Sequence, residues 1–587
     1  MENNPTRKKK KRKNSRKKKN GGRWKLILGT VLFLLLVIGG LVGYFLYKRY
    51  SYGTERADLT DWFGVHEASE YPVILNDEQT EIVLKRIDGH LYMPLDLLHE
   101  MISDRYYYGR EDGIFVYTTP TAVITSQIGG SSCTSTEDGV TELPYVISRM
   151  EQDTLYVAVE YVRQYHNITF ETFDAPNRVR MYTGTLTTQT ALVTKDTQLR
   201  IAGGIKSPII TDLAEGDRVV IVDDSLGDWI KVRTPDAFTG YVEQKRLSET
   251  ESFTYGSNAI QDPVYTNISR PFKICLGWHQ IAGVGGNDTL QEVIAPAKGM
   301  NVISPTWIRL TDDFGGIESF GTTDYVNAAH AAGLEVWALV SNFENAGVDT
   351  QAVVSHAASR KTLTENLIAE IKRLGCEGIN VDFEGVPPEA GKDYVQWLRE
   401  LSIACRREQI VLSIDNYVPY GFNDYYDRRE QGIIADYVII MGYDEHYGGS
   451  PEAGSVASVE FVRYGVEETV KQVPAEKVIN AVPFYTRVWT TKPDGSVTSF
   501  ATGMNGGKEA AAERGISFQW DAETGQYYGG RTYDDGTKVE IWLEDGESLT
   551  EKIAVMRANN IAGVAGWRLG LESAEAWEVI SGYVNGY

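Results

Sequence analysis

Residues 378–385 read GINVDFEG, a short segment in which apolar and polar side chains alternate. Because successive side chains of a β-strand point to opposite faces, Asn380, Asp382 and Glu384 share one face and the apolar residues between them share the other. Carboxyl groups are costly to bury unless they are paired or serve a function, and neighbouring acids push their proton affinities apart. The segment is therefore a candidate catalytic strand end. Solvent-exposed acids at the end of a strand are the alternative interpretation.

This segment is the fourth of eight short apolar stretches that alternate with amphipathic helical runs from Pro271 onward. Such alternation predicts parallel βαβ units, and eight of them over residues 262–587 predict a TIM (β/α)8 barrel with its active site at the C-terminal ends of the strands. A long insertion at residues 485–549 is rich in Gly, Asp and aromatic residues and is predicted to form hairpins. The predicted strands are residues 273–278, 301–305, 335–340, 378–383, 410–416, 437–443, 477–482 and 561–567.

Three further motifs lie in order at predicted strand ends. MGYD (441–444) ends the sixth strand, PFYTRVW (483–489) follows the seventh, and GW (566–567) ends the eighth. Together with GINVDFEG, these motifs resemble family 18 of the glycoside hydrolases, whose signature is D-x-D-x-E. The resemblance covers roughly residues 262–587 and looks closest to bacterial spore-cortex and cell-wall N-acetylglucosaminidases.

The resemblance implies a mechanism in which the acetamide of the substrate is the nucleophile. Glu384 would be the general acid that protonates the glycosidic oxygen, and later the base that activates water. Asp382 would hold the acetamide nitrogen and stabilise the oxazoline-like intermediate. Tyr443 would donate a hydrogen bond to the acetamide oxygen as it attacks.

Further residues are expected to bind the sugar. Asp444 would orient it, and Trp567 would form the floor of the subsite by stacking on the apolar face of the ring. Met441 belongs to the same motif as Asp444, Tyr417 ends the fifth strand beside the cleft, and Arg487 would contact the substrate or pair with Asp444. A structural role is equally well supported for Tyr417. Core packing is the alternative for Trp567, and a barrel-end hydrogen-bonded pair is the alternative for the Tyr and Asp of MGYD.

Asn380 stands where the family signature usually begins with Asp. Asn can hydrogen-bond Asp382 but carries no second negative charge. The similar cell-wall enzymes tolerate Asn here, so we expect this chain to remain active. Asn416 is a further candidate for the cleft wall. Trp278 and Trp307 lie near the mouth, where packing is favoured over sugar stacking.

No cofactor and no metal ion are expected. His446 lacks a second ligand, the chain contains no C-x-x-C motif, and GVGG (283–286) lacks the context of a nucleotide-binding loop. Four cysteines in 587 residues exclude a disulfide-built scaffold, and a hydrophobic content of 42% excludes a mostly disordered chain.

Charge is distributed unevenly along the chain. The net charge is −22, yet residues 1–25 hold 13 Lys and Arg and a single acid, Glu2. The rest of the chain carries 45 basic against 79 acidic residues. This acidic balance argues against a nucleic-acid partner. The basic run from Lys8 to Lys13 could serve nucleic-acid binding or nuclear targeting if it stood alone.

A stretch without charges follows the basic segment, from Leu26 to Tyr47. Its 22 residues would span about 33 Å as a helix, enough to cross a membrane. A cleaved signal peptide is the alternative, but its apolar core would be shorter and small residues would follow. We therefore predict a single-pass anchor with residues 1–25 in the cytoplasm and the remainder outside the cell.

Residues 60–186 contain an internal echo. DGHLYMPLDLLHEM (88–101) resembles QDTLYVAVEYVRQY (152–165), and each is followed by strand-like sequence that ends in a tyrosine. The echo predicts a duplicated α+β unit. It looks like stalk-type repeats that resemble the N-terminal domain of copper amine oxidases, and we expect a spacer or wall-contact module.

Residues 190–248 look like a bacterial SH3 domain. Short strand-like runs alternate with turn residues, and Trp229 and the GYV ending (240–242) match the family pattern. Such modules commonly bind cell-wall peptides, and a structural barrel without a ligand is an equal alternative. Residues 249–262 are predicted to be an irregular linker.

The sequence therefore predicts a multidomain, membrane-anchored glycosidase that cleaves β-1,4 bonds at N-acetylglucosamine in peptidoglycan. Chitin would undergo the same chemistry. The alternative is a non-catalytic glycan-binding or structural cell-wall protein on the same barrel, but such proteins typically lose the acid that Glu384 retains.

Overall fold

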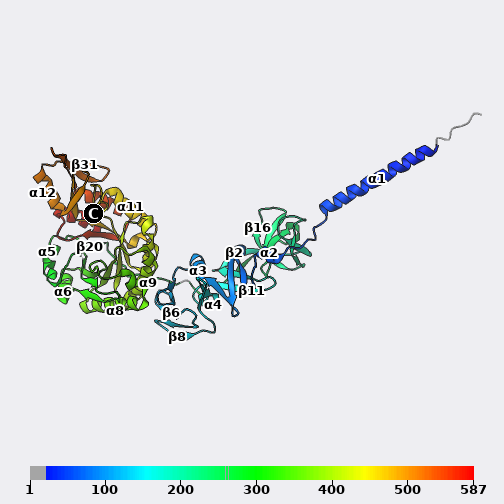
Figure 1. Ribbon diagram of the computed structural model, residues 1–587, viewed down its shortest axis with the longest axis horizontal. Coiled ribbons are helices and arrows are strands. Elements are labelled where there is room, and N and C mark those ends of the chain that lie inside the picture. Colours follow the sequence, from blue (N-terminus) through cyan, green and yellow to red (C-terminus); the bar gives the residue numbers. More distant parts are fainter. Residues whose placement is uncertain (1–20, 258, 262, 587) are drawn as a thin grey trace, which may run out of the picture. The chain divides into compact units, whose positions relative to one another are not determined.

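The computed structural model describes residues 21–257, 259–261 and 263–586. These residues form two compact units (Figure 1). One unit contains residues 21–89 and 167–260, and the other contains residues 90–166 and the chain from residue 261 onward. Most of the basic N-terminal segment, residues 1–20, lies outside the described residues.

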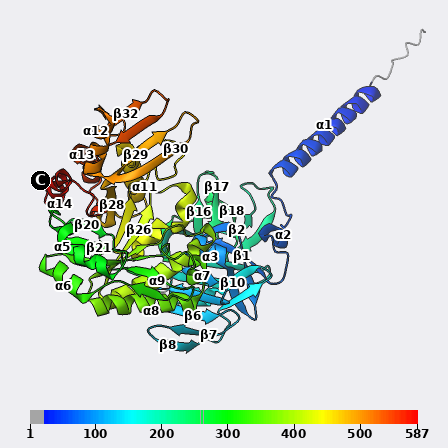
Figure 2. The same cartoon turned by 60° about the vertical axis from the view of Figure 1, so that its left-hand side comes forward.

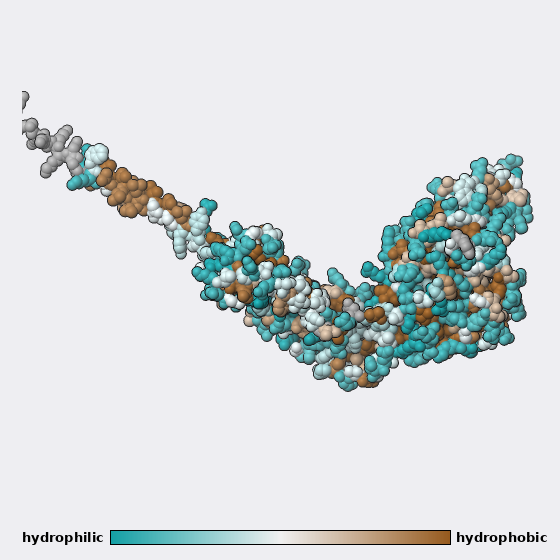
Figure 3. Space-filling view, turned by 180° about the vertical axis from the view of Figure 1, so that it is seen from behind, coloured by the Kyte–Doolittle hydropathy of each residue, from teal (hydrophilic) through white to brown (hydrophobic). Residues whose placement is uncertain are grey.

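Helix α1 (Gly21–Tyr50) contains the predicted apolar stretch and extends beyond it at both ends. Between Arg23 and Tyr50 its mean hydropathy reaches 2.7, and Figure 3 shows it as a brown apolar rod. By length and composition this helix is able to cross a membrane.

The first unit continues with two small modules. Helix α2 (Leu59–Phe63) precedes a four-stranded arrangement in the order β11-β12-β1-β2. The SH3-like module follows in the order β15-β14-β18-β17-β16-β13-β19. Their bounds are Glu70–Leu75 (β1), Glu78–Ile87 (β2), Ile168–Phe173 (β11), Arg178–Thr183 (β12), Leu186–Leu192 (β13), Thr197–Arg200 (β14), Ile209–Leu213 (β15), Arg218–Asp223 (β16), Trp229–Arg233 (β17), Thr239–Glu243 (β18) and Glu251–Tyr255 (β19).

Strand β19 corrects one prediction. The sequence predicted an irregular linker over residues 249–262, but Glu251–Tyr255 pairs antiparallel with β13. Its residues are largely exposed. The alternation of apolar and polar residues that identifies a half-buried strand in a sequence is therefore weak here. The backbone hydrogen bonds with β13, rather than burial, define it.

Residues 90–166 begin and end with the echoed segments. Strand β3 (His90–Pro94) leads directly into α3 (Leu95–Met101), and β10 (Thr154–Ala158) leads into α4 (Val159–Val162). Strands β3 and β10 pair antiparallel with each other. The strands between them are β4 (Tyr106–Gly109), β5 (Ile114–Thr118), β6 (Val123–Gln127), β7 (Ser132–Ser135), β8 (Gly139–Glu142) and β9 (Ser148–Glu151).

Within residues 263–586, eight parallel strands close into a barrel in the order β21-β20-β34-β28-β27-β26-β25-β24, with β24 pairing back to β21. Each predicted strand overlaps one of them, so the predicted TIM barrel is confirmed. The strands are β20 (Ile274–His279), β21 (Val302–Pro305), β24 (Glu335–Ser341), β25 (Gly378–Asp382), β26 (Val411–Tyr417), β27 (Tyr437–Met441), β28 (Val478–Pro483) and β34 (Gly563–Trp567). A hairpin of β22 (Ile308–Leu310) and β23 (Ile317–Ser319) extends beside β24.

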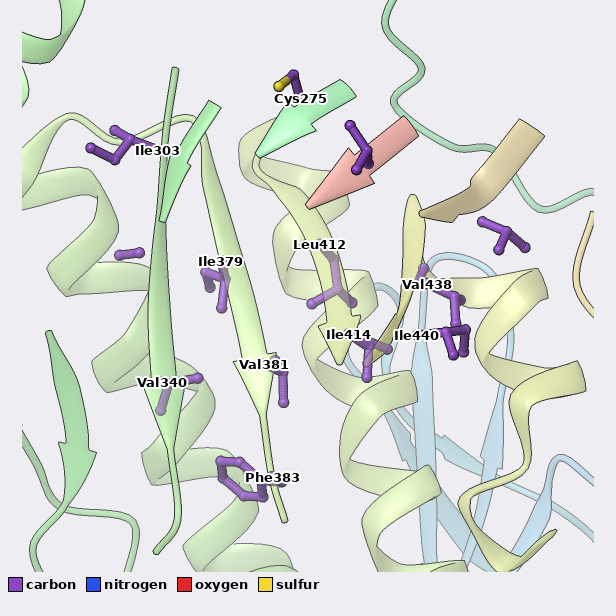
Figure 4. Packing of buried hydrophobic residues seen from close by; sticks show 14 of the residues in the cluster. Cys275, Ile303, Val340, Ile379, Val381, Phe383, Leu412, Ile414, Val438 and Ile440 are labelled. Carbon is purple, nitrogen blue, oxygen red and sulfur yellow. The ribbon is translucent and has the colours of Figure 1, made fainter. Parts of the chain in front are cut away.

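Strand β25 separates its side chains as the alternation predicted. Ile379, Val381 and Phe383 are buried in the large apolar cluster between strands and helices, as Figure 4 shows. Asn380 and Asp382 point to the barrel interior, where both are buried. The surrounding helices are α5 (Leu290–Ile294), α6 (Thr323–Ala331), α7 (Thr350–Ser355), α8 (Ala357–Leu374), α9 (Gly391–Glu408), α10 (Arg428–Ile434), α11 (Val459–Val470), α13 (Gly546–Ala558) and α14 (Ala574–Val584).

The insertion after β28 forms an antiparallel sheet in the order β30-β29-β33-β32-β31, in the orange part of the chain (Figure 2). The predicted hairpins are present, but the sequence did not predict helix α12 (Met504–Arg514), which packs against β29 and β30. The strands are β29 (Tyr485–Thr491), β30 (Val497–Gly503), β31 (Phe518–Asp521), β32 (Gln526–Thr532) and β33 (Lys538–Trp542).

Residues 90–166 are joined to the barrel by buried polar contacts. Glu430 on α10 accepts hydrogen bonds from Arg105 at 2.9 and 3.0 Å and from Arg399 on α9 at 2.8 Å. Its side chain is 8% exposed, and the two guanidinium groups hold the pKa of this carboxyl below its usual range despite burial. In a second contact, the hydroxyl of Tyr107 donates a hydrogen bond to Oδ1 of Asp393 at 2.6 Å. These contacts agree with the placement of residues 90–166 in the same compact unit as the barrel.

Glu430→Ala should lower the free energy of unfolding by about 3 kcal/mol, because it leaves the buried guanidinium group of Arg399 and the half-buried one of Arg105 without their shared counter-charge. Denaturant unfolding of the purified chain measures this loss. The matched control is Glu365→Ala, which removes an exposed pair with Lys361 and should cost at most about 0.5 kcal/mol. Equal effects of the two substitutions would contradict a joining role for Glu430.

Candidate active site

A cavity of about 830 Å³ opens at the C-terminal ends of the barrel strands. Strand β25 and its continuation contribute Asp382 and Glu384, and β26 contributes Asp415 and Tyr417. The cavity also brings together four predicted residues from β27, the turn after it and β34: Met441, Tyr443, Asp444 and Trp567.

Asn380 lies beneath the cavity and does not line it. Its Oδ1 accepts hydrogen bonds from Nε1 of Trp278 at 2.8 Å and from Oγ of Ser304 at 3.1 Å. Its Nδ2 donates to Oδ1 of Asp415 at 2.8 Å. All four side chains are buried. Asn380 therefore orients Asp415, whereas the sequence led us to expect substrate binding or a contact with Asp382.

Asp382 is buried between other acids. Its Oδ1 has no hydrogen-bond partner among the described residues. Burial raises the pKa of Asp382 well above its usual range, and the negative charges of Asp415 and Glu384 raise it further. Burial raises the pKa of Asp415 in the same direction, against the hydrogen bond from Asn380. This buried pair therefore holds protons that exposed carboxyl groups would release.

Glu384 is half-buried, and the side chain of Asn342 holds its backbone. Its N–H donates to Oδ1 of Asn342 at 2.8 Å, and Nδ2 of Asn342 donates to the Glu384 carbonyl at 2.8 Å. The hydroxyl of Tyr417 donates to Oε2 of Glu384 at 2.9 Å. Burial raises the pKa of Glu384, Asp444 adds to the rise, and the Tyr417 hydrogen bond opposes it. A carboxyl group with a raised pKa is suited to donate a proton near neutral pH.

The turn after β27 carries Tyr443 and Asp444. Burial, reinforced by Asp382, raises the pKa of Tyr443 well above its usual value, so the phenol remains a hydrogen-bond donor. Asp444 has a φ of 58° and accepts a hydrogen bond from the hydroxyl of Tyr485 at 2.5 Å. Arg487 stands 4.0 Å from Asp444 and does not line the cavity. Arg487 is thus placed to pair with Asp444, one of the two contacts expected for it.

Trp567 ends β34 and packs edge-on against Trp278, with ring centroids 5.8 Å apart at 67°. A Cβ atom at Gly566 would lie 2.2 Å from the ring of Phe484, so only glycine fits before this tryptophan. Trp278 is almost fully buried but still lines the cavity, whereas Trp307 is buried and bonded to Asn287. Trp567 therefore supplies the larger ring surface at this end.

Sequence reasoning missed Asp415 and named its neighbour instead. Asn416 faces away from the cavity and hydrogen-bonds Gln431 on α10. The same alternation that was applied to β25 places Asp415 and Tyr417 on one face of β26 and Asn416 on the other. Five aromatic residues on the cavity wall were also missed: Phe343, Tyr420, Phe422, Tyr447 and Phe461.

Acidic side chains line the cavity. Among the described residues that line it, six are acidic and none is basic: Glu344, Asp382, Glu384, Asp415, Asp444 and Glu445. Such a site favours neutral or cationic groups and stabilises positive charge that develops during a reaction.

Two family models match parts of this chain. The model of the family described as "Glycosyl hydrolases family 18" matches residues 302–572. The model described as "Bacterial SH3 domain" matches residues 195–248, which confirms the predicted SH3-like module.

Three relatives match the barrel region. "Uncharacterized glycosylase YvbX" of Bacillus subtilis (strain 168) is 31% identical over 258 residues, which cover 42% of this chain and 74% of that protein. "Cortical fragment-lytic enzyme" of the same organism is 24% identical, with 42% and 59% covered. "Chitinase 1" of Aphanocladium album is 25% identical, with 37% and 57% covered. The chain spans less than two thirds of the last two relatives.

Asp415→Asn should flatten the pH dependence of stability. A carboxyl group with a raised pKa binds protons more tightly in the folded chain, so stability falls as pH rises above the usual value of 3.8 towards the folded-state value. Asn keeps an acceptor for Asn380 but removes a titrating charge beside Asp382. The fall in melting temperature between about pH 5 and about pH 8 should therefore be smaller than in the unaltered chain.

The matched control is Asp534→Asn, which removes an exposed carboxyl from the insertion. Its melting curves should parallel those of the unaltered chain. A pH dependence of Asp415→Asn that matches the control would contradict the assignment of buried titration to this cluster.

Proposed function

We propose that this chain, which belongs to family 18 of the glycosyl hydrolases and is a glycosidase, cleaves β-1,4 bonds at N-acetylglucosamine in peptidoglycan on the outer side of a membrane. The observation that carries the chemistry is Glu384, whose carboxyl lines the cavity and has its pKa raised by burial. Its backbone is fixed by Asn342 and its carboxyl by Tyr417.

In the first step Glu384 gives its proton to the glycosidic oxygen, and the bond from that oxygen to C1 of the sugar breaks. The acetamide oxygen of the same sugar bonds to C1, which gives a positively charged oxazolinium ion. Tyr443 donates to the acetamide oxygen and orients it for this attack. Asp382 accepts the hydrogen of the acetamide nitrogen through its unpaired Oδ1 and stabilises the positive charge that develops on the intermediate.

In the second step the Glu384 carboxylate takes a proton from water while the water oxygen attacks C1. The oxazolinium ring opens, the acetamide is restored, and the product keeps the β configuration. Trp567 stacks under the sugar. Asp444, which accepts a hydrogen bond from Tyr485, also binds the sugar. The acidic cavity favours the cationic intermediate because it holds no competing basic group among its described lining residues.

The proposed location and substrate are supported by the segments before the barrel and by the relatives of the barrel. Helix α1 is long and apolar enough to anchor the protein, and the basic residues before it favour a cytoplasmic N-terminus. The SH3-like module and the echoed β-α segments would hold the barrel near the wall and raise its local concentration there. The relative named cortical fragment-lytic enzyme supports a peptidoglycan substrate. The relative named chitinase supports chitin as the second candidate.

Glu384→Gln should lower kcat on purified peptidoglycan by at least about a hundredfold, because the amide cannot protonate the leaving oxygen. Mass spectrometry of the soluble products should show new N-acetylglucosamine reducing ends from the unaltered protein. Glu389→Gln, an exposed change five residues later, is the matched control and should keep full activity. The enzyme proposal fails if neither peptidoglycan nor chitin oligomers are cut, or if Glu384→Gln cuts them as fast as the control.

Tyr417→Phe should move the alkaline limb of the pH–rate profile to higher pH. Glu384 must be protonated to act, and activity is lost as pH rises through its pKa. The Tyr417 hydrogen bond lowers that pKa, so its removal raises it further. A limb that moves to lower pH, or stays in place, would show that this hydrogen bond does not tune the acid.

A further inference from the structure

Three aromatic rings stack in a row at the rim of the cavity. The ring of Tyr420 lies 5.8 Å from Phe422 with an interplanar angle of 8°, and 5.1 Å from Tyr464 with an angle of 22°. Tyr420 and Phe422 line the cavity, and Tyr464 on α11 stacks on Tyr420 outside the cavity lining. Phe422 is 78% exposed, so the ring at the end of the row leaves much of its surface open to solvent.

The segment that carries these rings is rigid. Asn423, 2% exposed, accepts the N–H of Tyr420 at 3.0 Å and donates to the carbonyl of Val418 at 3.0 Å. Arg428 is fully buried and donates to Oδ1 of Asn423 at 2.8 Å and to the carbonyl of Tyr417 at 3.1 Å. Burial lowers the pKa of Arg428 to about 10. The backbone on both sides of Phe422 is therefore held by buried hydrogen bonds, which lowers the entropy lost when a ligand packs on its ring.

The same segment connects the row to the candidate acid. Tyr417, whose carbonyl Arg428 holds, donates to Glu384. In the closed strand order β25 and β26 are neighbours, whereas β34, which ends at Trp567, lies on the other side of the barrel. Phe422 is therefore on the side of the mouth where Glu384 stands, across from the ring expected to floor the cleaved sugar.

The geometry points to Phe422 as an outer sugar-binding subsite on the leaving-group side of Glu384, with Tyr420 and Tyr464 as positioning residues that hold its ring. This assignment rests on the proposed function. Its ligand is a hexosamine ring of the same glycan. This ring lies on the leaving-group side, beyond the sugar that carries the leaving oxygen. A pyranose ring has an apolar face of axial C–H groups that matches an exposed aromatic ring, and the edge of the acidic cavity favours uncharged over anionic ligands.

We infer that the ligand is the glycan strand itself, because this surface is continuous with the reaction cavity. Tyr420 and Phe422 line the same cavity as Glu384, on the side of the barrel across from Trp567, so a glycan strand that continues past Glu384 on that side would meet them. The subsite would make the protein prefer long glycan strands to short ones, because a short substrate ends before it reaches Phe422.

The test compares Phe422→Ala with the unaltered full chain on two probes: the hexamer of N-acetylglucosamine, and an aryl glycoside of its dimer, whose leaving group is a single small ring. We expect kcat/KM on the hexamer to fall about five- to tenfold, mainly through KM, as expected for loss of one stacking contact. Activity on the aryl dimer should stay within about twofold of the unaltered chain. Phe422→Trp should restore the preference for the hexamer.

Phe314→Ala is the matched control, because Phe314 is 74% exposed and does not line the cavity. It should change neither probe. Tyr464→Leu should weaken hexamer cleavage without affecting the aryl dimer, since it removes only the back of the row. Equal losses on both probes would overturn the subsite, as would no loss on the hexamer. If the unaltered chain cleaves neither probe nor peptidoglycan, the proposed function itself fails.

Discussion

The site depends on a buried cluster of carboxyl groups that no basic side chain neutralises among the described residues that line the cavity. Asp382 and Asp415 lie side by side within the barrel mouth, and Glu384 stands above them at the cavity wall. Desolvation disfavours the ionised form of each group, and every further charge raises the penalty. The pKa of each group is therefore raised above its usual value. A raised pKa suits the acid proposed for glycoside cleavage, and it reduces the stability of the barrel as pH rises.

Asn380 fits this constraint. The family signature usually has an acid at this position, which would add a fourth carboxyl to the buried cluster. Here the amide donates to Asp415 and accepts from Trp278 and Ser304, so each of its polar atoms is satisfied without charge. The departure from the family pattern therefore orients Asp415 at a lower electrostatic cost. Asp382, by contrast, lines the cavity and keeps one oxygen without a hydrogen-bond partner among the described residues.

The barrel and most of its site could be predicted because parallel strands are buried on both faces and appear in the sequence as short apolar runs. The period of two in β25 then placed Asp382 correctly, and the same rule would have found Asp415 in β26. Helix α12 was not predicted, since its Gly506 and Gly507 resemble a loop and packing against the insertion sheet stabilises it. The contact of Arg105 with Glu430 joins residues 325 apart, and no local pattern encodes such a partner.

The configuration of the first product tests the central claim most directly, because attack by the acetamide followed by water inverts C1 twice. Proton NMR of a fresh digest of N-acetylglucosamine oligomers, recorded before the sugar ring equilibrates, distinguishes the two anomers at the new reducing end. The account predicts that the β anomer forms first and the α anomer grows later by mutarotation. A first product in the α configuration would contradict it, since water would then have displaced the leaving group directly.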